Sequence, residues 1–152
     1  MSTRITTSSH GYDLADSASL ALIQAIGGFQ ARILEWLVKE LWKEGFSELT
    51  PTMLTFLGAL DCGINHASAL ARDLNVSRQA IHKQVRELEK LGWLATEPHP
   101  DKGNQRVIVF TAEGERMMSA ARALFADLDH RLSVALPADI ADLGRHLSAF
   151  KP

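Results

Sequence analysis

The residues best able to do chemistry in this chain lie on one short segment, from Ser77 to Arg86. Ile81 and Val85 are four residues apart, so in a helix they share the face that packs inward. Arginine and lysine side chains pair with guanine or phosphate, and glutamine pairs with adenine. A solvated surface helix also explains such a polar face, and the neighbouring segments must decide between the two interpretations. The face opposite the apolar one carries Arg78, Gln79, His82, Lys83 and Arg86.

The segment before this face predicts a second helix that would position it. Residues 66–75 carry apolar side chains at helical spacing, and the small side chain of Ala71 lets another helix approach closely. Ser77 supplies the capping oxygen of the following helix, and its hydroxyl is also placed to contact a phosphate. Gly92 ends that helix. The two helices and their tight turn match a helix-turn-helix.

A β-hairpin is predicted directly after these helices. Residues 93–96 and 106–110 have strand character, and the polar, turn-rich residues 97–104 connect them. A two-stranded wing in this position can reach the neighbouring groove or the DNA backbone. The donors near its tip are Lys102, Asn104 and Arg106.

The distribution of charge agrees with a nucleic-acid contact in this part of the chain. The 152 residues have a net charge of −2, which excludes a protein that coats nucleic acid or membrane with its whole surface. Residues 64–110 hold seven Lys and Arg against five Asp and Glu, so this stretch is +2 and the rest of the chain −4. Because the bias is modest, salt-sensitive binding by a dimer is favoured over tight binding by a monomer.

Further helices are expected on both sides of the hairpin and helix-turn-helix. Thr50, Thr111 and Pro137 are expected to open three of them, and Met118 begins the apolar stripe of the second of these. The apolar stripes exceed what one small winged domain can cover, so two chains are expected to pair with two-fold symmetry. Such a pair would place two recognition helices about 34 Å apart, one turn of DNA. The expected flanking helices are 17–43, 50–63, 111–133 and 138–150.

Three runs of the sequence resemble the MarR family of bacterial transcription regulators. They are LARDLNVSRQAI at 70–81, VRELEKLGWL at 85–94 and FTAEG at 110–114, the last similar to the family's Leu-Thr-x-x-Gly. The resemblance covers about residues 54–118 well, and the flanking helices by order and length. It implies a mainly α fold with a small β-hairpin wing. This is a winged helix-turn-helix that dimerises through its N- and C-terminal helices.

The resemblance also implies a function and a domain organisation. The expected protein is a cytoplasmic, sequence-specific regulator of transcription, a ligand-responsive repressor that binds a pseudo-palindromic operator in double-stranded DNA as a homodimer. Residues 1–16 are expected to form a flexible tail and 17–152 one domain. Within the domain, 17–46 and 112–152 are the dimerisation helices and 50–111 the DNA-binding lobe. The expected DNA contacts are Ser77, Arg78, Gln79, His82, Lys83, Arg86, Lys102, Asn104 and Arg106.

One residue of the wing departs from the family pattern. The family often has an Asp two residues before the wing Arg, and Asn104 stands in that position here, ahead of Arg106. Lys102 or Asn104 is therefore the alternative to Arg106 as the residue at the wing tip.

Four aromatic residues form a candidate effector pocket. Members of the family often release DNA on binding a small, aromatic or anionic molecule, expected at the junction of the dimerisation helices and the DNA-binding lobe. Aromatic residues at helical spacing are also the usual constituents of a core, so both interpretations stay open. The four residues are Phe29, Trp36, Trp42 and Phe46.

Other functions receive less support from the residue types. Cys62 is the single cysteine, so no intrachain disulfide is possible, and we expect it to be inert although a redox-sensing thiol is an alternative. The six histidines lack a tight ligand spacing, so neither a metal nor another cofactor is expected, and metal sensing is also an alternative. No nucleophile motif, P-loop or membrane-length apolar run is present, so we expect neither an enzyme nor a membrane partner. A winged helix that serves protein contacts alone is the remaining alternative.

Overall fold

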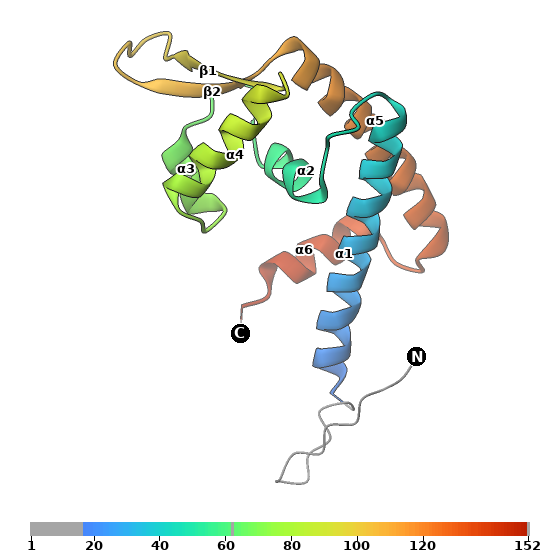
Figure 1. The fold of residues 1–152 in the computed structure, drawn as a ribbon. Coiled ribbons are helices and arrows are strands. Elements are labelled where there is room, and N and C mark those ends of the chain that lie inside the picture. The colour runs from blue at the N-terminus through green and yellow to red at the C-terminus, as the bar shows by residue number, and fades with distance from the viewer. Residues whose placement is uncertain (1–16, 62, 152) are drawn as a thin grey trace, which may run out of the picture.

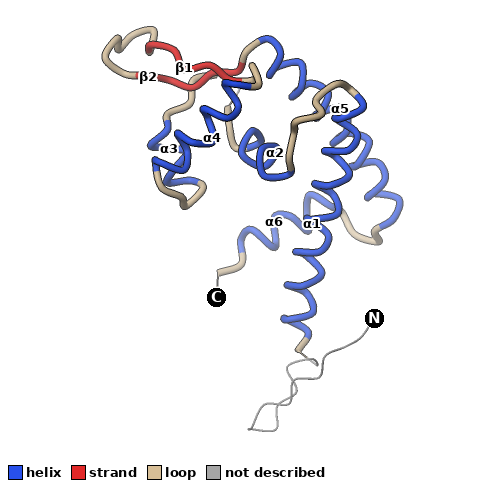
Figure 2. The backbone as a smooth tube through the Cα atoms, in the orientation of Figure 1, coloured by secondary structure: helices blue, strands red, loops and turns tan. Residues whose placement is uncertain are grey.

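Six helices and one two-stranded antiparallel sheet make up the part of the chain that the structure, a computed structural model, describes: residues 17–61 and 63–151. The expected tail at 1–16 and Cys62 lie outside the described residues. Figures 1 and 2 show the predicted fold class, mainly helical with a hairpin wing, which is thereby confirmed. The elements are α1 (Ala18–Lys43), α2 (Pro51–Gly58), α3 (Ala67–Asp73), α4 (Arg78–Lys90), β1 (Leu94–Pro98), β2 (Arg106–Phe110), α5 (Ala112–Ala135) and α6 (Ile140–Ala149).

The helix starts follow from local side-chain chemistry. Thr50 and Thr111 cap α2 and α5 through their hydroxyls, as the sequence predicts, and Ser17 and Ser77 do the same for α1 and α4. The prediction that Pro137 opens the last helix is wrong, because α6 starts three residues later, at Ile140, with Asp139 as its cap. There the Asp139 carboxylate accepts the backbone N–H of Asp142 at 2.8 Å.

Three helix ends share one backbone arrangement. After α1, α3 and α4 the chain enters the left-handed region at Gly45 (φ 100°), Asn75 (φ 53°) and Gly92 (φ 77°). In each case the next residue's N–H bonds to a carbonyl five residues back, which is the Schellman motif. Asparagine tolerates this conformation better than other residues with a side chain, so Asn75 turns the chain between α3 and α4.

Two element boundaries and one core position differ from the prediction for reasons of tertiary contact. Helix α2 ends at Gly58 and not near Gly63, because the chain beyond it turns to bind β2. Strand β1 begins at Leu94, since the Trp93 N–H is bonded to the carbonyl of Leu88 in α4. In α5 the fully buried methionine is Met117, and Met118 lies at the edge of the core.

The core lies where the C-terminal half of α1 meets α2, α4, the hairpin and the start of α5. Its fully buried side chains include Leu41, Leu57, Ile81, Leu88 and Met117. The first half of α1 extends away from this lobe toward α6, so the molecule is elongated (Figure 1). No helix among the described residues is long and apolar enough to span a membrane.

Candidate DNA-binding surface

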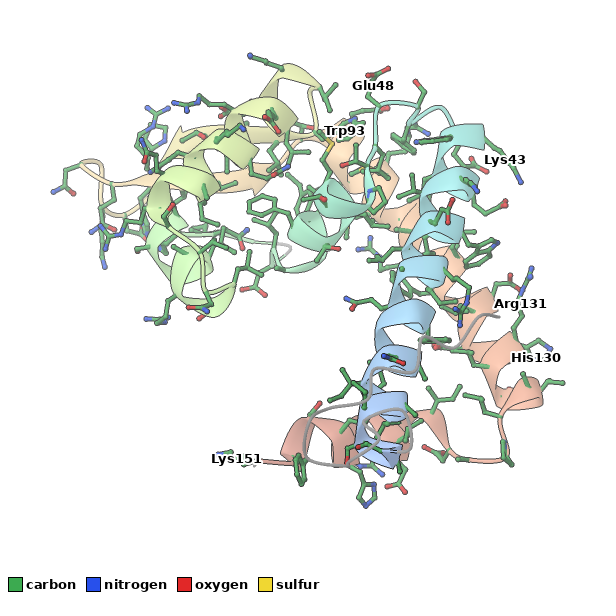
Figure 3. The ribbon with its side chains drawn as sticks, turned by 60° about the horizontal axis from the view of Figure 1, so that its bottom comes forward. Lys43, Glu48, Trp93, His130, Arg131 and Lys151 are labelled. Carbon is green, nitrogen blue, oxygen red and sulfur yellow. The ribbon has the colours of Figure 1, made fainter. Side chains whose placement is uncertain are left out.

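Helix α4 has two faces of opposite character. Its apolar residues Ile81, Val85 and Leu88 are at most 3% exposed. Every predicted contact residue of the helix lies on the exposed side, which is the arrangement that a recognition helix needs. Figure 3 shows side chains ending in nitrogen around this lobe, at a distance from the labelled Lys43 and Arg131. The exposed residues are Arg78, Gln79, His82, Lys83 and Arg86.

Helix α3 supports α4 from behind. Leu70 and Ala71 are buried, and the Ala71 carbonyl accepts the N–H of Val76 at 2.9 Å, which sets the path of the turn. Ser77 is exposed, and its hydroxyl accepts the Ala80 N–H at 3.1 Å. The cap leaves the first turn of α4 open to solvent, where a recognition helix meets the edges of bases.

The hairpin lies beside the helix-turn-helix and projects beyond it (Figure 1). Its antiparallel register pairs Leu94 with Phe110 and Pro98 with Arg106, so residues 99–105 form the tip. Lys102 and Asn104 are exposed on that tip.

Arg106 is turned back across the hairpin. Its Nη2 donates to the carbonyl oxygen of Thr96 on the opposite strand at 2.8 Å. A guanidinium held in this way braces the two strands at the base of the tip. Of the three wing residues, the structure thus brings Lys102 and Asn104 together at the tip and leaves Arg106 on β2.

Two histidines without a role in the sequence prediction build the tip. The Nδ1 atom of His99 accepts the backbone N–H of Asp101 at 3.0 Å and that of Lys102 at 3.2 Å. The His99 ring lies against the ring of His66, the residue before α3, with centroids 5.8 Å apart and planes 18° from parallel. The signal in the sequence was a histidine between two prolines immediately before a turn.

Asn65 is the other residue that the sequence prediction missed. It is 5% exposed, and its amide bonds to Asp61 and to the carbonyls of Gly63 and Ile108. Its backbone also exchanges two hydrogen bonds with Ile108 in β2. Since a buried amide must satisfy all its polar atoms, this residue fastens the start of α3 to the wing.

Thr111 joins the hairpin to α5. Its hydroxyl donates to the Gly92 carbonyl at 2.6 Å and accepts the N–H of Gly114 at 3.1 Å, while its own N–H bonds to the Trp93 carbonyl. A Cβ at Gly114 would overlap that same carbonyl oxygen. Trp93 thus lies between α4 and the start of α5 (Figure 3), and the Thr-x-x-Gly run packs α5 against it.

The four aromatic residues of the expected effector pocket are not gathered in one place. Phe46 is buried, edge-on to Trp93, and half-buried Trp36 has the Arg131 guanidinium over its ring at 5.3 Å. Phe29 is 41% exposed on the first half of α1. Only Trp42 lines the groove beside α1, whose volume is about 600 Å³ and whose other lining residues include Leu34, Val38 and Pro51.

One exposed ion pair lies at the start of α5, shortly after β2. Arg116 makes two hydrogen bonds to the Glu113 carboxylate and lies over the Phe46 ring at 4.3 Å. The bonded guanidinium lowers the pKa of Glu113, and the carboxylate raises the pKa of Arg116.

Among the described residues, no three histidine, cysteine or acidic side chains cluster as metal ligands would.

Comparison with known proteins places the fold. No protein-family model and no curated protein matches the chain. Among solved structures, wild-type apo MarR from E. coli superposes with a TM-score of 0.62 at 21% identity, over 87% of this chain and 95% of that one.

Two further structures were solved with bound molecules. CouR from Rhodococcus jostii RHA1, bound to p-coumaroyl-CoA, has a TM-score of 0.68 at 18% identity, over 88% of this chain and 90% of that one. A mutant of MepR from S. aureus, bound to an oligodeoxyribonucleotide, has a TM-score of 0.54 at 16% identity, over 90% of this chain and all of that one. The resemblance found in the sequence is therefore confirmed at the level of fold: this chain has the winged helix-turn-helix fold of the MarR-family transcription regulators.

Proposed function

We propose that this protein is a sequence-specific DNA-binding regulator of transcription, acting as a ligand-responsive repressor. The observation that carries the proposal is the row of exposed donors on α4 opposite its buried face. Arg78, Gln79 and His82 would meet base edges, and Lys83 and Arg86 guanine or phosphate. Ser77 would contact phosphate, and the tip residues Lys102 and Asn104 the flanking groove.

Arg106 enters this proposal with a changed role. Because its guanidinium bonds to the Thr96 carbonyl, it would support the wing from within the hairpin and leave the groove contact to Lys102. The bond is exposed, so DNA phosphate competes for the same guanidinium.

A homodimer is part of the proposal. Ile23 on α1 is 67% exposed and Phe150, just after α6, is 75% exposed, and Leu143 and Leu147 of α6 are each 45% exposed. Apolar side chains so exposed at one end of a molecule mark an interface. A second copy with two-fold symmetry would cover them and present two α4 helices to one pseudo-palindromic site.

The groove beside α1 supports the ligand-responsive part. It runs from Gly27 to Trp42 along α1 and reaches Pro51 at the start of α2, so a bound molecule would touch the long helix and the DNA-binding lobe at once. The groove is mainly apolar, which suits an aromatic molecule. Lys39 at its edge is paired with the Glu35 carboxylate at 2.9 Å, so an aromatic acid would compete with Glu35 for that ammonium group. Since one fold neighbour was solved with p-coumaroyl-CoA, that thioester and salicylate are the first probes. Binding should change Trp42 fluorescence and release DNA. If neither probe alters fluorescence or melting temperature, this part of the proposal fails.

The direct test is fluorescence anisotropy on a duplex from immediately upstream of the protein's own gene, against a scrambled duplex. Replacing Lys83 and Arg86 with alanine should cost about 1–3 kcal/mol of binding at each site. The melting temperature should hardly change, since both side chains are exposed. Lys43→Ala is the matched control, because Lys43 is an exposed cation at the C-terminal end of α1, away from α4 (Figure 3).

The same binding measurement distinguishes DNA binding from the alternative function, in which the winged helix serves protein contacts alone. If Lys83→Ala/Arg86→Ala binds the duplex as well as the unaltered protein does, α4 is not the helix that contacts the DNA bases. A winged helix used for protein contacts would then be favoured.

A further inference from the structure

The wing tip is held together by one imidazole. His99 accepts two backbone N–H groups of the tip at Nδ1, from Asp101 and Lys102, and its own backbone N–H bonds to the Gln105 carbonyl at 2.8 Å. The Gln105 N–H then bonds back to the Lys102 carbonyl at 2.8 Å. The backbone position of Lys102 is thus set by His99 from one side and by Gln105 from the other.

These contacts determine which nitrogen of His99 carries its proton. A nitrogen approached by two N–H donors must present a lone pair, so Nδ1 is bare and the proton of the neutral ring sits on Nε2. Protonation at Nδ1 would turn the acceptor into a third donor facing the other two. The tip turn would lose its cap in that state.

The stack of His66 against His99 is also sensitive to protonation of the imidazole rings. It lies directly ahead of α3 and its side chain makes no capping hydrogen bond, so its role in the structure is the stack against His99. Both rings are half-buried, and two neutral imidazoles stack without electrostatic cost. Two imidazolium rings 5.8 Å apart would repel.

The charged groups around the pair do not offset that repulsion. Helix α3 has no charged residue in its first turn. The hairpin next to the ring has exposed carboxylates at Glu97 and Asp101 and exposed cations at Lys102 and Arg106, which cancel in formal charge. It is the backbone N–H of Asp101 that meets Nδ1, so the direction of the hydrogen bonds decides the outcome.

We propose that His99, seated in its neutral form on His66, is a positioning residue that holds Lys102 and Asn104 of the wing in the arrangement that contacts DNA. The inference rests on the proposed DNA-binding function. Protonation of the ring at Nδ1 removes the acceptor of both N–H groups, so protonation of His99 loosens the tip and weakens the contribution of the wing to DNA affinity.

The first arm of the test uses the full-length protein without DNA. Nitrogen-15 spectra between about pH 8 and pH 5.5 follow the His99 ring and the amides of Asp101 and Lys102. We expect a bare Nδ1 at the higher pH, and amide signals that move with the same midpoint as the ring. A protonated Nδ1 in the neutral ring, or amides that ignore the ring's titration, overturns the inference.

The second arm measures binding to the duplex from upstream of the protein's own gene across the same pH range. His99→Asn puts the Oδ1 acceptor near the place of Nδ1 and cannot titrate, whereas His99→Phe keeps a ring without an acceptor. At the higher pH we expect His99→Asn to bind as the unaltered protein does. At the lower pH we expect the unaltered protein to bind on the order of tenfold more weakly than His99→Asn, since two hydrogen bonds are lost.

The controls isolate the wing from other titrating groups. His82 on α4 is the same in every variant at His99, so the ratio of affinities removes its effect. His130→Asn, on α5 away from the wing (Figure 3), should leave the pH profile unchanged. His99→Phe should bind weakly at every pH.

Parallel profiles for the unaltered protein and His99→Asn would overturn the proposal. If the duplex does not bind at all, the spectra still decide the hydrogen-bond arrangement. Failure of the inference and failure of the proposed function are therefore distinguishable.

Discussion

Gly114 and Gly144 both lie in helices, but their surroundings differ: one is tightly packed and the other is open. Gly114 lies against the carbonyl of Trp93, where any side chain would overlap backbone. Gly144, in the middle of α6, has open space around the position of a Cβ. At an open helix position, glycine lowers stability because it loses more conformational entropy on folding than alanine does. At a close backbone contact, glycine is required because no side chain fits.

Alanine at these two positions should therefore act in opposite directions. We expect Gly114→Ala to lower the free energy of unfolding by about 3 kcal/mol, because backbone must move to admit the methyl group. We expect Gly144→Ala to raise it by about 0.5–1 kcal/mol. Urea unfolding followed by circular dichroism measures both, and a stable Gly114→Ala would show that α5 does not pack on Trp93 as described.

The pair of Glu113 and Arg116 makes a separate prediction about acid. Hydrogen bonding to Arg116 lowers the pKa of Glu113 below its ordinary value of 4.5, so the pair's contribution to folding is present above that pH. It is lost as the pH falls through the lowered pKa of the folded state. The melting temperature of the unaltered protein should thus drop more on acidification than that of Arg116→Gln. The two curves should converge at high salt, since both groups are exposed, and equal acid sensitivity at low salt would contradict the pairing.

At the scale of elements, the wing acts as an extension of the helix-turn-helix. Asn65 binds it to the segment before α3, His66 touches its tip, and Thr111 ties its base to α5. The hairpin is thereby fixed at three places: by Asn65 and His66, which lie well before it in the sequence, and by Thr111, which directly follows β2. A two-stranded hairpin alone is marginally stable in water, so these contacts are what give it one orientation.

Two wing residues should therefore respond differently to substitution. Lys102→Ala should reduce the slope of log affinity against log salt by about one unit, because one phosphate contact is lost, and should leave stability unchanged. Arg106→Ala should change the salt slope less and loosen the hairpin, since its guanidinium bonds to Thr96. Anisotropy titrations at several salt concentrations distinguish the two. A larger loss of slope for Arg106→Ala would mean that this guanidinium leaves Thr96 for phosphate in the complex.

At the scale of the whole molecule, the apolar end formed by α1 and α6 stands apart from the lobe (Figure 1). The buried core ends near the middle of α1, and α6 has no buried residue. A helix with an apolar stripe and nothing to cover it is unstable as an isolated element. The second copy proposed above would cover this stripe.

Placing charge in that stripe should separate the copies. Leu143→Glu/Leu147→Glu should sediment as the single 16.7 kDa chain, while the unaltered protein sediments at twice that mass. The variant should also lose most of its affinity for the duplex, because two recognition helices no longer bind together. Asp142→Asn/Arg145→Gln, which changes the exposed ion pair on the same helix, is the control and should remain dimeric. A dimer that survives both leucine substitutions would place the interface elsewhere.

The sequence by itself determined the features that depend on near neighbours. Caps such as Thr50, Ser77 and Thr111, the glycine after α4 and the two faces of α4 all follow from residues three to five positions apart. Local spacing sets these interactions before the chain folds, so the element order and the row of donors could be predicted.

Only the tertiary structure decided the contacts between distant segments. The stack of His66 on His99, the bond of Asn65 to Ile108 and the need for glycine at position 114 join residues far apart in sequence. The same holds for Phe46, which is buried with its ring edge-on to Trp93. Such contacts depend on how loops close and helices pack, and no spacing along the chain encodes them.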